Sequence, residues 1–178
     1  ARISSPNYEM IQRAAGITLQ FQGVTIGDVY EMHTLFEPPA ARLVAERNSE
    51  KAVPLLRAII EQELSLAKDR FAVTPVLAEF HRVLIEMAGN KTLVVINQAL
   101  RGLANAHMEL AQRRNPVVDP EFSERQLRFG FKSHAKLVDL IEAKDGPGAE
   151  AHWRNHMIAA GKVWMAQIGS DAIVDLID

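Results

Sequence analysis

Helical periodicity, broken by strong stop signals, is the feature that most restricts what this chain can fold into. Residues 77–88 show it most clearly, because their apolar side recurs at the i, i+4, i+7, i+8 spacing of a core-facing helix. Gly89-Asn90 follows as a stop signal. No window of the chain alternates convincingly at the period of two that a half-buried strand needs. The pattern therefore predicts an all-α domain.

Proline and glycine signals divide the chain into six or seven expected helices. A short helix near residues 7–16 precedes a break at Gly23. Pro38-Pro39 should kink or restart the next helix, because each proline lacks an amide donor and clashes with the preceding turn. The main expected helices are residues 27–47, 49–68, 75–88, 91–114, 120–143 and 149–169, with a short tail helix from Ser170.

Three further signals place helix boundaries and faces. Thr74-Pro75 and Asp119-Pro120 each indicate a helix N-cap followed by proline at the first helical position. Gly146-Pro147-Gly148 is expected to form a turn. The chain shows no internal repeat and no long linker, so we predict one bundle. The expected inner side of the second helix consists of Val29, Tyr30, His33, Phe36, Ala40 and Val44.

The composition narrows the function classes. The 178 residues carry a formal charge of −2, which does not indicate that this stretch alone binds nucleic acid. The absence of cysteine excludes disulfides and thiolate metal sites and fits a reducing cytosol. No apolar run approaches the roughly 20 residues that span a bilayer. Because the first residue is not Met, we expect a fragment or processed product of a cytoplasmic protein.

Three histidines lie on the apolar faces of three separate expected helices. His81 belongs to the stripe of residues 77–88, and His134 and His156 share their faces with Val138, Ile141, Trp153, Ala160 and Val163. Burying an imidazole without a partner costs about 1–3 kcal/mol. A shared divalent metal would satisfy all three, since three neutral imidazoles and one open position form a recognised site type. The alternative for each is a packed core histidine.

Other polar residues are expected in the same interior. His152 precedes His156 by one turn, so it is either an additional metal ligand or a histidine at the edge of the stripe. His33, Asn97 and His107 also lie on inward faces, and a cavity that they line would suit a small polar ligand. The alternative is that these groups hydrogen-bond one another or backbone carbonyls.

Four segments together carry a family resemblance. They are DVYEMHTLFEPPAARLVAER, FHRVLIEMAGN, KSHAKLVDLIEAKD and AEAHWRNHM, in that order. The ordered set resembles the FadR-type C-terminal (FCD) domain of GntR-superfamily transcription regulators, over roughly residues 25–168. The resemblance implies an antiparallel bundle of six to seven helices that follows a winged-helix DNA-binding domain. Residues 1–24 would be the linker from that absent domain, and residues 25–178 the effector-binding domain.

The resemblance also implies a metal site with one departure. The family holds a divalent metal, such as zinc, nickel or manganese, with an aspartate and three histidines. The matching histidines are His81, His134 and His156. The aspartate position is Leu77 here, so water, an effector carboxylate or His152 would complete the shell, unless the histidines bind the effector directly. The family tends to carry an arginine where this chain has His33.

The predicted function is effector sensing and dimerisation in a GntR-type regulator, not enzymatic turnover. A small organic acid would enter the bundle and shift its conformational equilibrium, which would reorient the DNA-binding domains of a homodimer. DNA would be contacted only through the N-terminal domain, and no membrane contact is expected. Two other classes stay open: a metal-dependent enzyme and the ligand domain of another all-helical regulator, such as the TetR group.

Overall fold

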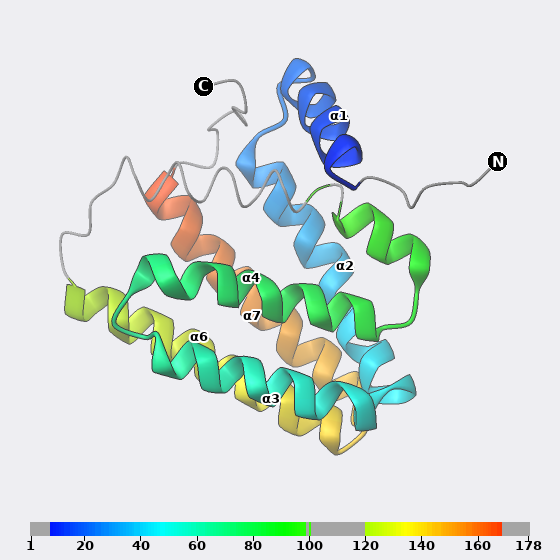
Figure 1. Cartoon of the computed structure of the whole chain (residues 1–178), viewed down its shortest axis with the longest axis vertical. Helices are drawn as coiled ribbons and strands as arrows, with labels where there is room; N and C mark the ends of the chain where they lie inside the picture. The colour runs from blue at the N-terminus through cyan, green and yellow to red at the C-terminus, as the bar shows by residue number, and fades with distance from the viewer. Residues whose placement is uncertain (1–7, 99, 101–119, 169–178) are drawn as a thin grey trace.

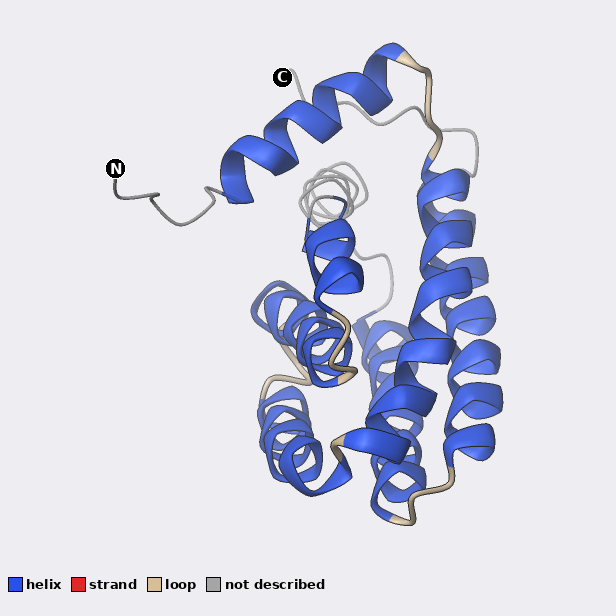
Figure 2. Cartoon of the chain, turned by 90° about the vertical axis from the view of Figure 1, so that its right-hand side faces the viewer, coloured by secondary structure: helices blue, strands red, loops and turns tan. Residues whose placement is uncertain are grey.

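Every element that the structure describes is a helix (Figure 2). The computed structural model describes residues 8–98, 100 and 120–168. Its helices are α1 (Tyr8–Phe21), α2 (Ile26–Arg47), α3 (Ser49–Ser65), α4 (Arg70–Met87), α6 (Pro120–Glu142) and α7 (Gly146–Ile168), and residues 91–98 are also helical. The predicted all-α bundle is therefore confirmed. Within the described ranges, no helix is long and apolar enough to cross a membrane.

Five of these helices enclose one core. α2 packs along α7, while α3 packs against α4 and α6. Figure 1 shows α1 beyond the end of this bundle, joined to α2 by a short loop. The largest fully buried apolar side chains of the main core are Trp153, Phe80, Leu56, Leu84, Ile85, Leu137 and Ile141. They come from α3, α4, α6 and α7, so the histidine-bearing faces of α4, α6 and α7 point inward together.

The expected interruption of the second helix is wrong in one respect. α2 does not restart at Pro38-Pro39 but continues through both prolines to Arg47. The prolines forgo two backbone hydrogen bonds, but Ala40, Ala41 and Val44 are completely buried just beyond them. Packing of that face against the core maintains the helix, since tertiary burial outweighs local propensity. A capping box between Thr25 and Asp28 starts the same helix.

Two expected boundaries are also corrected. α4 begins four residues before Thr74-Pro75, because the Asp69 side chain accepts hydrogen bonds from the amides of Phe71 and Ala72. Gly146-Pro147-Gly148 is not a turn but the start of α7. Asp145 caps this helix through the Gly148 amide at 2.9 Å, and a Cβ at Gly148 would collide with the Asp145 carboxylate.

Other predicted boundaries are confirmed. Gly23 breaks the chain between α1 and α2 with a φ of +67°, and Gly89 ends α4 with a φ of +75°. Such left-handed backbone favours glycine at helix ends. α6 starts at Pro120, as predicted, and α3 ends at Ser65, three residues before the expected end. The expected end of the helix at Asn115-Pro116 and the tail helix from Ser170 lie outside the described residues.

Candidate metal and effector site

The three histidines on separate helices meet inside the bundle. His81 lies on α4, His134 on α6 and His156 on α7, and one ring nitrogen from each lies within 4.8 Å of the others. The His134 and His156 rings are 5.1 Å apart at their centroids and meet edge to face. His134 is buried, with 2% of its surface exposed, and the other two are partly buried. The convergence that the three apolar faces predicted is therefore present.

A buried carboxylate on α2 holds His81. Glu37 is 2% exposed, and its Oε2 accepts a hydrogen bond from His81 Nδ1 at 2.6 Å. The same oxygen accepts the indole N–H of Trp153 at 3.0 Å, and Oε1 accepts from His33 Nδ1 at 2.9 Å. Burial alone would raise the pKa of Glu37, but the His81 and His33 imidazoles outweigh that effect and keep its pKa below the ordinary value. Glu37 is thus an ionised acceptor with three donors.

A second buried carboxylate, from α3, holds His134. Glu63 is fully buried, and its Oε1 lies 2.8 Å from His134 Nδ1. Its Oε2 is also buried and has no hydrogen-bond partner among the described residues. Burial raises the pKa of Glu63 to about 8, against a smaller lowering effect of His81. Glu63 is therefore less well satisfied than a buried carboxylate usually is.

Aromatic rings pack against the histidines of the cluster. The Trp153 ring stacks on His156 with centroids 4.4 Å apart, and Phe80 stacks on His134 at 4.1 Å. Burial, with the neighbouring His134 and His81, lowers the pKa of His156 to about 2. Burial and His81 also lower the pKa of His134 well below its ordinary value. Both rings are therefore neutral at pH 7, the form that binds a metal ion.

The remaining predicted site residues are placed differently. His152 lies outside the cluster, since its Nε2 donates to the Ser133 carbonyl oxygen at 2.8 Å. His33 reaches the cluster only indirectly, through Glu37. Asn97 is buried, with 7% of its surface exposed, and His107 lies outside the described residues.

Position 77 contributes no ligand. Leu77 packs against a small apolar cluster of Ala67, Val73 and Phe131. A leucine side chain there offers no donor atom to a metal, so the chain differs from the four-ligand pattern that the resemblance implied. Any carboxylate near the histidines must therefore come from another position.

Sequence reasoning gave Glu37 no specific role and missed Glu63 entirely. Both occupy core positions: Glu37 stands one turn before the buried Ala41, and Glu63 one turn after the buried Ile59. An acid at such a position is a usable signal, because buried carboxylates are rare unless they are paired. The expected inner residue Phe36 is instead 39% exposed, and its neighbour Glu37 takes the inward position.

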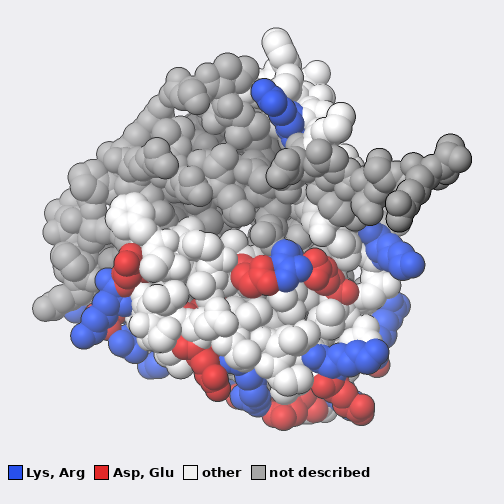
Figure 3. All heavy atoms as spheres, viewed as in Figure 1, with Lys and Arg blue, Asp and Glu red and all other residues white. Residues whose placement is uncertain are grey.

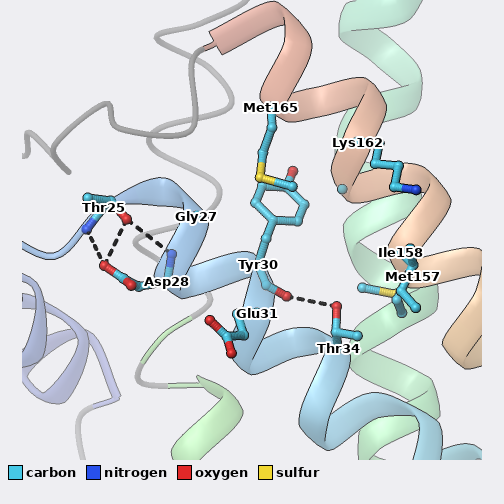
Figure 4. A pocket seen from close by; sticks show the side chains of 11 residues that line it. Thr25, Gly27, Asp28, Tyr30, Glu31, Thr34, Met157, Ile158, Lys162 and Met165 are labelled. Atoms are coloured by element: carbon cyan, nitrogen blue, oxygen red, sulfur yellow. Dashed lines mark hydrogen bonds between the residues drawn. The ribbon is translucent and has the colours of Figure 1, made fainter.

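A separate cleft lies between α2 and α7. It has a volume of about 430 Å³ and is lined by Thr25, Asp28, Tyr30, Met157, Lys162 and Met165 among others (Figure 4). Among the described residues, neither the histidines nor Asn97 line it. It is therefore distinct from the histidine cluster.

The surface visible in Figure 3 mixes both charge signs. On the part of this face that the structure describes, lysine and arginine side chains alternate with aspartate and glutamate. Arg57 of α3, for example, bridges Asp139 and Glu142 of α6. A mixed surface of this kind does not provide the basic stripe that binds a nucleic-acid backbone.

Comparison with known proteins identifies the family of the chain. The family model described as "FCD domain" matches residues 28–159. The curated relatives include the HTH-type transcriptional repressor NanR of Salmonella schwarzengrund (strain CVM19633) and of Salmonella typhimurium (strain LT2), each 26% identical over 169 residues. These matches cover 93% of this chain but only 62% of each relative. No solved structure matches significantly. The chain therefore belongs to the FCD domain family of GntR-type regulators.

Proposed function

We propose that this chain is the effector-sensing domain of a transcription regulator whose bundle holds a divalent metal ion at His81, His134 and His156. The observation that carries the proposal is the convergence of three imidazoles from three helices, with ring nitrogens within 4.8 Å of one another. Two of these rings have lowered pKa values and are neutral at pH 7. Three imidazole ligands suit zinc and nickel, and manganese if oxygen ligands complete its shell.

The residues around the cluster fit a cation. Nδ1 of His81 and Nδ1 of His134 are hydrogen-bonded to glutamates, an arrangement that orients the opposite ring nitrogen toward a metal. The buried Oε2 of Glu63 lacks a partner in the described part of the chain, and a positive charge nearby would offset that cost. The metal would supply an electrophilic centre for an anionic oxygen.

The proposed effector is a small carboxylate-bearing metabolite. With Leu77 in place of an acidic ligand, three protein ligands would leave a coordination position for an effector carboxylate. An effector of this kind shifts the protein between two states only by its different affinity for each of them. Helices α4, α6 and α7 each contribute one histidine, so a change in the metal's shell would act on all three helices.

The partner proposals follow from the relatives. The relatives' name contains the designation HTH, and this chain spans 62% of their length. We propose that a DNA-binding domain precedes residues 1–24, which would link it to the effector-binding domain of residues 25–178. The cytoplasmic regulator would act as a homodimer whose two-fold symmetry matches a palindromic operator.

Elemental analysis of the purified chain tests the proposal. Wild type, His134→Ala and His152→Ala would be dialysed without added metal or chelator and then analysed for zinc, nickel and manganese. The expected result is near-stoichiometric metal in wild type and His152→Ala and none in His134→Ala. His152→Ala is the matched control, because its ring contacts Ser133 and lies outside the cluster.

The effector class is tested on the same samples. Short carboxylates should raise the melting temperature of metal-loaded wild type more than that of His134→Ala. Wild type that contains no metal and takes up none on titration would contradict the metal site. Equal stabilisation of both proteins would contradict coordination of the effector by the metal.

A further inference from the structure

Two buried carboxylates lie behind the cluster histidines, and neither belongs to a helix that supplies one of those histidines. Glu37 comes from α2 and Glu63 from α3, whereas the histidines come from α4, α6 and α7. The hydrogen bonds that join them span 44 residues for His81 and 71 residues for His134. All five of the described helices that enclose the core therefore contribute to this one site.

Glu37 determines which nitrogen of His81 faces away from it. The indole of Trp153 is only a donor, and it points at the oxygen that His81 also uses. An ionised carboxylate can only accept, so Nδ1 of His81 carries a hydrogen, and Nε2 is the nitrogen that a metal could use once the ring is neutral. Trp153 also stacks on His156, so Glu37 and this indole together constrain two of the three histidines.

Glu63 contributes an independent observation. One of its oxygens contacts His134 Nδ1, while Oε2 is buried without a partner among the described residues. Leaving a buried carboxylate oxygen unsatisfied is costly, and no described lysine or arginine forms an ion pair with Glu63. A cation bound by the adjacent imidazoles would supply the missing positive charge.

The residue at position 77 affects how much negative charge lies near the proposed metal. Leu77 brings no negative charge, and three neutral imidazoles bring none either. A divalent cation held by these ligands alone would be a buried double charge without compensation. Glu37 is ionised and supplies one negative charge beside His81, and Glu63 places a second carboxyl group beside His134.

We infer that Glu37 and Glu63 are positioning residues of the proposed metal site, which hold His81 and His134 in the metal-binding orientation through their hydrogen bonds. This inference rests on the proposed function. Carboxylates that orient metal-bound histidines typically change metal affinity about 10- to 100-fold when they are removed.

Zinc affinity tests the inference on the whole chain. Competition with a chromophoric zinc chelator would compare wild type, Glu63→Gln, Glu37→Gln and the control Glu61→Gln, which alters an exposed acid on the same helix as Glu63. We expect about 10- to 100-fold weaker zinc binding for Glu63→Gln and Glu37→Gln, and an unchanged affinity for Glu61→Gln. If circular dichroism shows that Glu63→Gln does not fold, the zinc affinity of Glu37→Gln is compared with that of wild type instead.

A second measurement reports the hydrogen position on the His81 ring in the absence of metal. Nitrogen-15 NMR of the histidine rings in metal-free protein should show His81 with its hydrogen on Nδ1 in wild type and a changed tautomer population in Glu37→Met, whose side chain has a similar length but no strong hydrogen-bond acceptor. Tight zinc binding by wild type and by both variants alike would overturn the inference and leave the metal site intact. An unchanged His81 tautomer in Glu37→Met would also overturn it. Wild type that binds no zinc would overturn the proposed metal site and this inference together.

Discussion

Glu37 and Glu63 are both buried acids beside an imidazole, but their surroundings differ. Glu37 accepts hydrogen bonds from three donors, whereas Glu63 has one partner and one oxygen without any in the described residues. Burial alone would raise the pKa of both carboxyls. The imidazoles of His81 and His33 reverse that effect at Glu37, while the pKa of Glu63 remains raised, at about 8. The number of hydrogen-bond donors, more than burial, therefore separates the two carboxylates.

Removing the whole Glu37 side chain should have the largest effect. Glu37→Ala leaves the His33, His81 and Trp153 donors without their common acceptor, so we expect a loss of about 3–5 kcal/mol in the free energy of unfolding. Urea denaturation of metal-free protein measures it. The control is Glu31→Ala, an exposed acid on the same helix, which should change stability by less than about 0.5 kcal/mol. A loss below about 1 kcal/mol for Glu37→Ala would contradict the three-donor description.

Glutamine substitutions should separate the two carboxylates at constant shape. In Glu37→Gln the amide oxygen can keep His81 and Trp153, but His33 must then accept from the NH₂ and all three hydrogen bonds lose their charged acceptor, so we expect a loss of about 1–3 kcal/mol. In Glu63→Gln only one partner must be satisfied, and His134 can donate to the amide oxygen or accept from its NH₂, so we expect a loss of less than about 1 kcal/mol. Thermal and urea unfolding in the presence of a chelator measure both. Equal losses would show that the donor count does not distinguish the sites.

The smallest predicted effect on stability concerns Asp28, an exposed carboxylate. The Thr25 amide, and then its hydroxyl, hold the pKa of Asp28 below its ordinary value of 3.8. The folded state therefore binds this proton less tightly than the unfolded chain. The stabilisation is present above pH 3.8 and is lost as the pH falls through the folded-state pKa. The difference in unfolding free energy between wild type and Asp28→Asn should shrink on acidification, and a constant difference would contradict the assignment.

Local signals predicted the helices and part of the site. The stripe of residues 77–88, the Gly89 stop and the Pro120 start all agree with the structure, because each depends on contacts within a few residues. The histidine faces of α4, α6 and α7 were predictable for the same reason. Where local signals failed, at Pro38-Pro39 and at residues 146–148, a buried face or an aspartate cap outweighed the usual preference of the residue type.

The sequence by itself determined that this protein is a helical bundle with histidines on three inward faces, since helical period and end signals are local. Only the tertiary structure decided which groups meet those histidines. Glu37 contacts Trp153 across 116 residues, and Glu63 contacts His134 across 71 residues. Helical periodicity indicates that a residue points inward, but it carries no information on its rotational and axial register against another helix. Packing sets that register, and with it the pairing of each carboxylate with its imidazole.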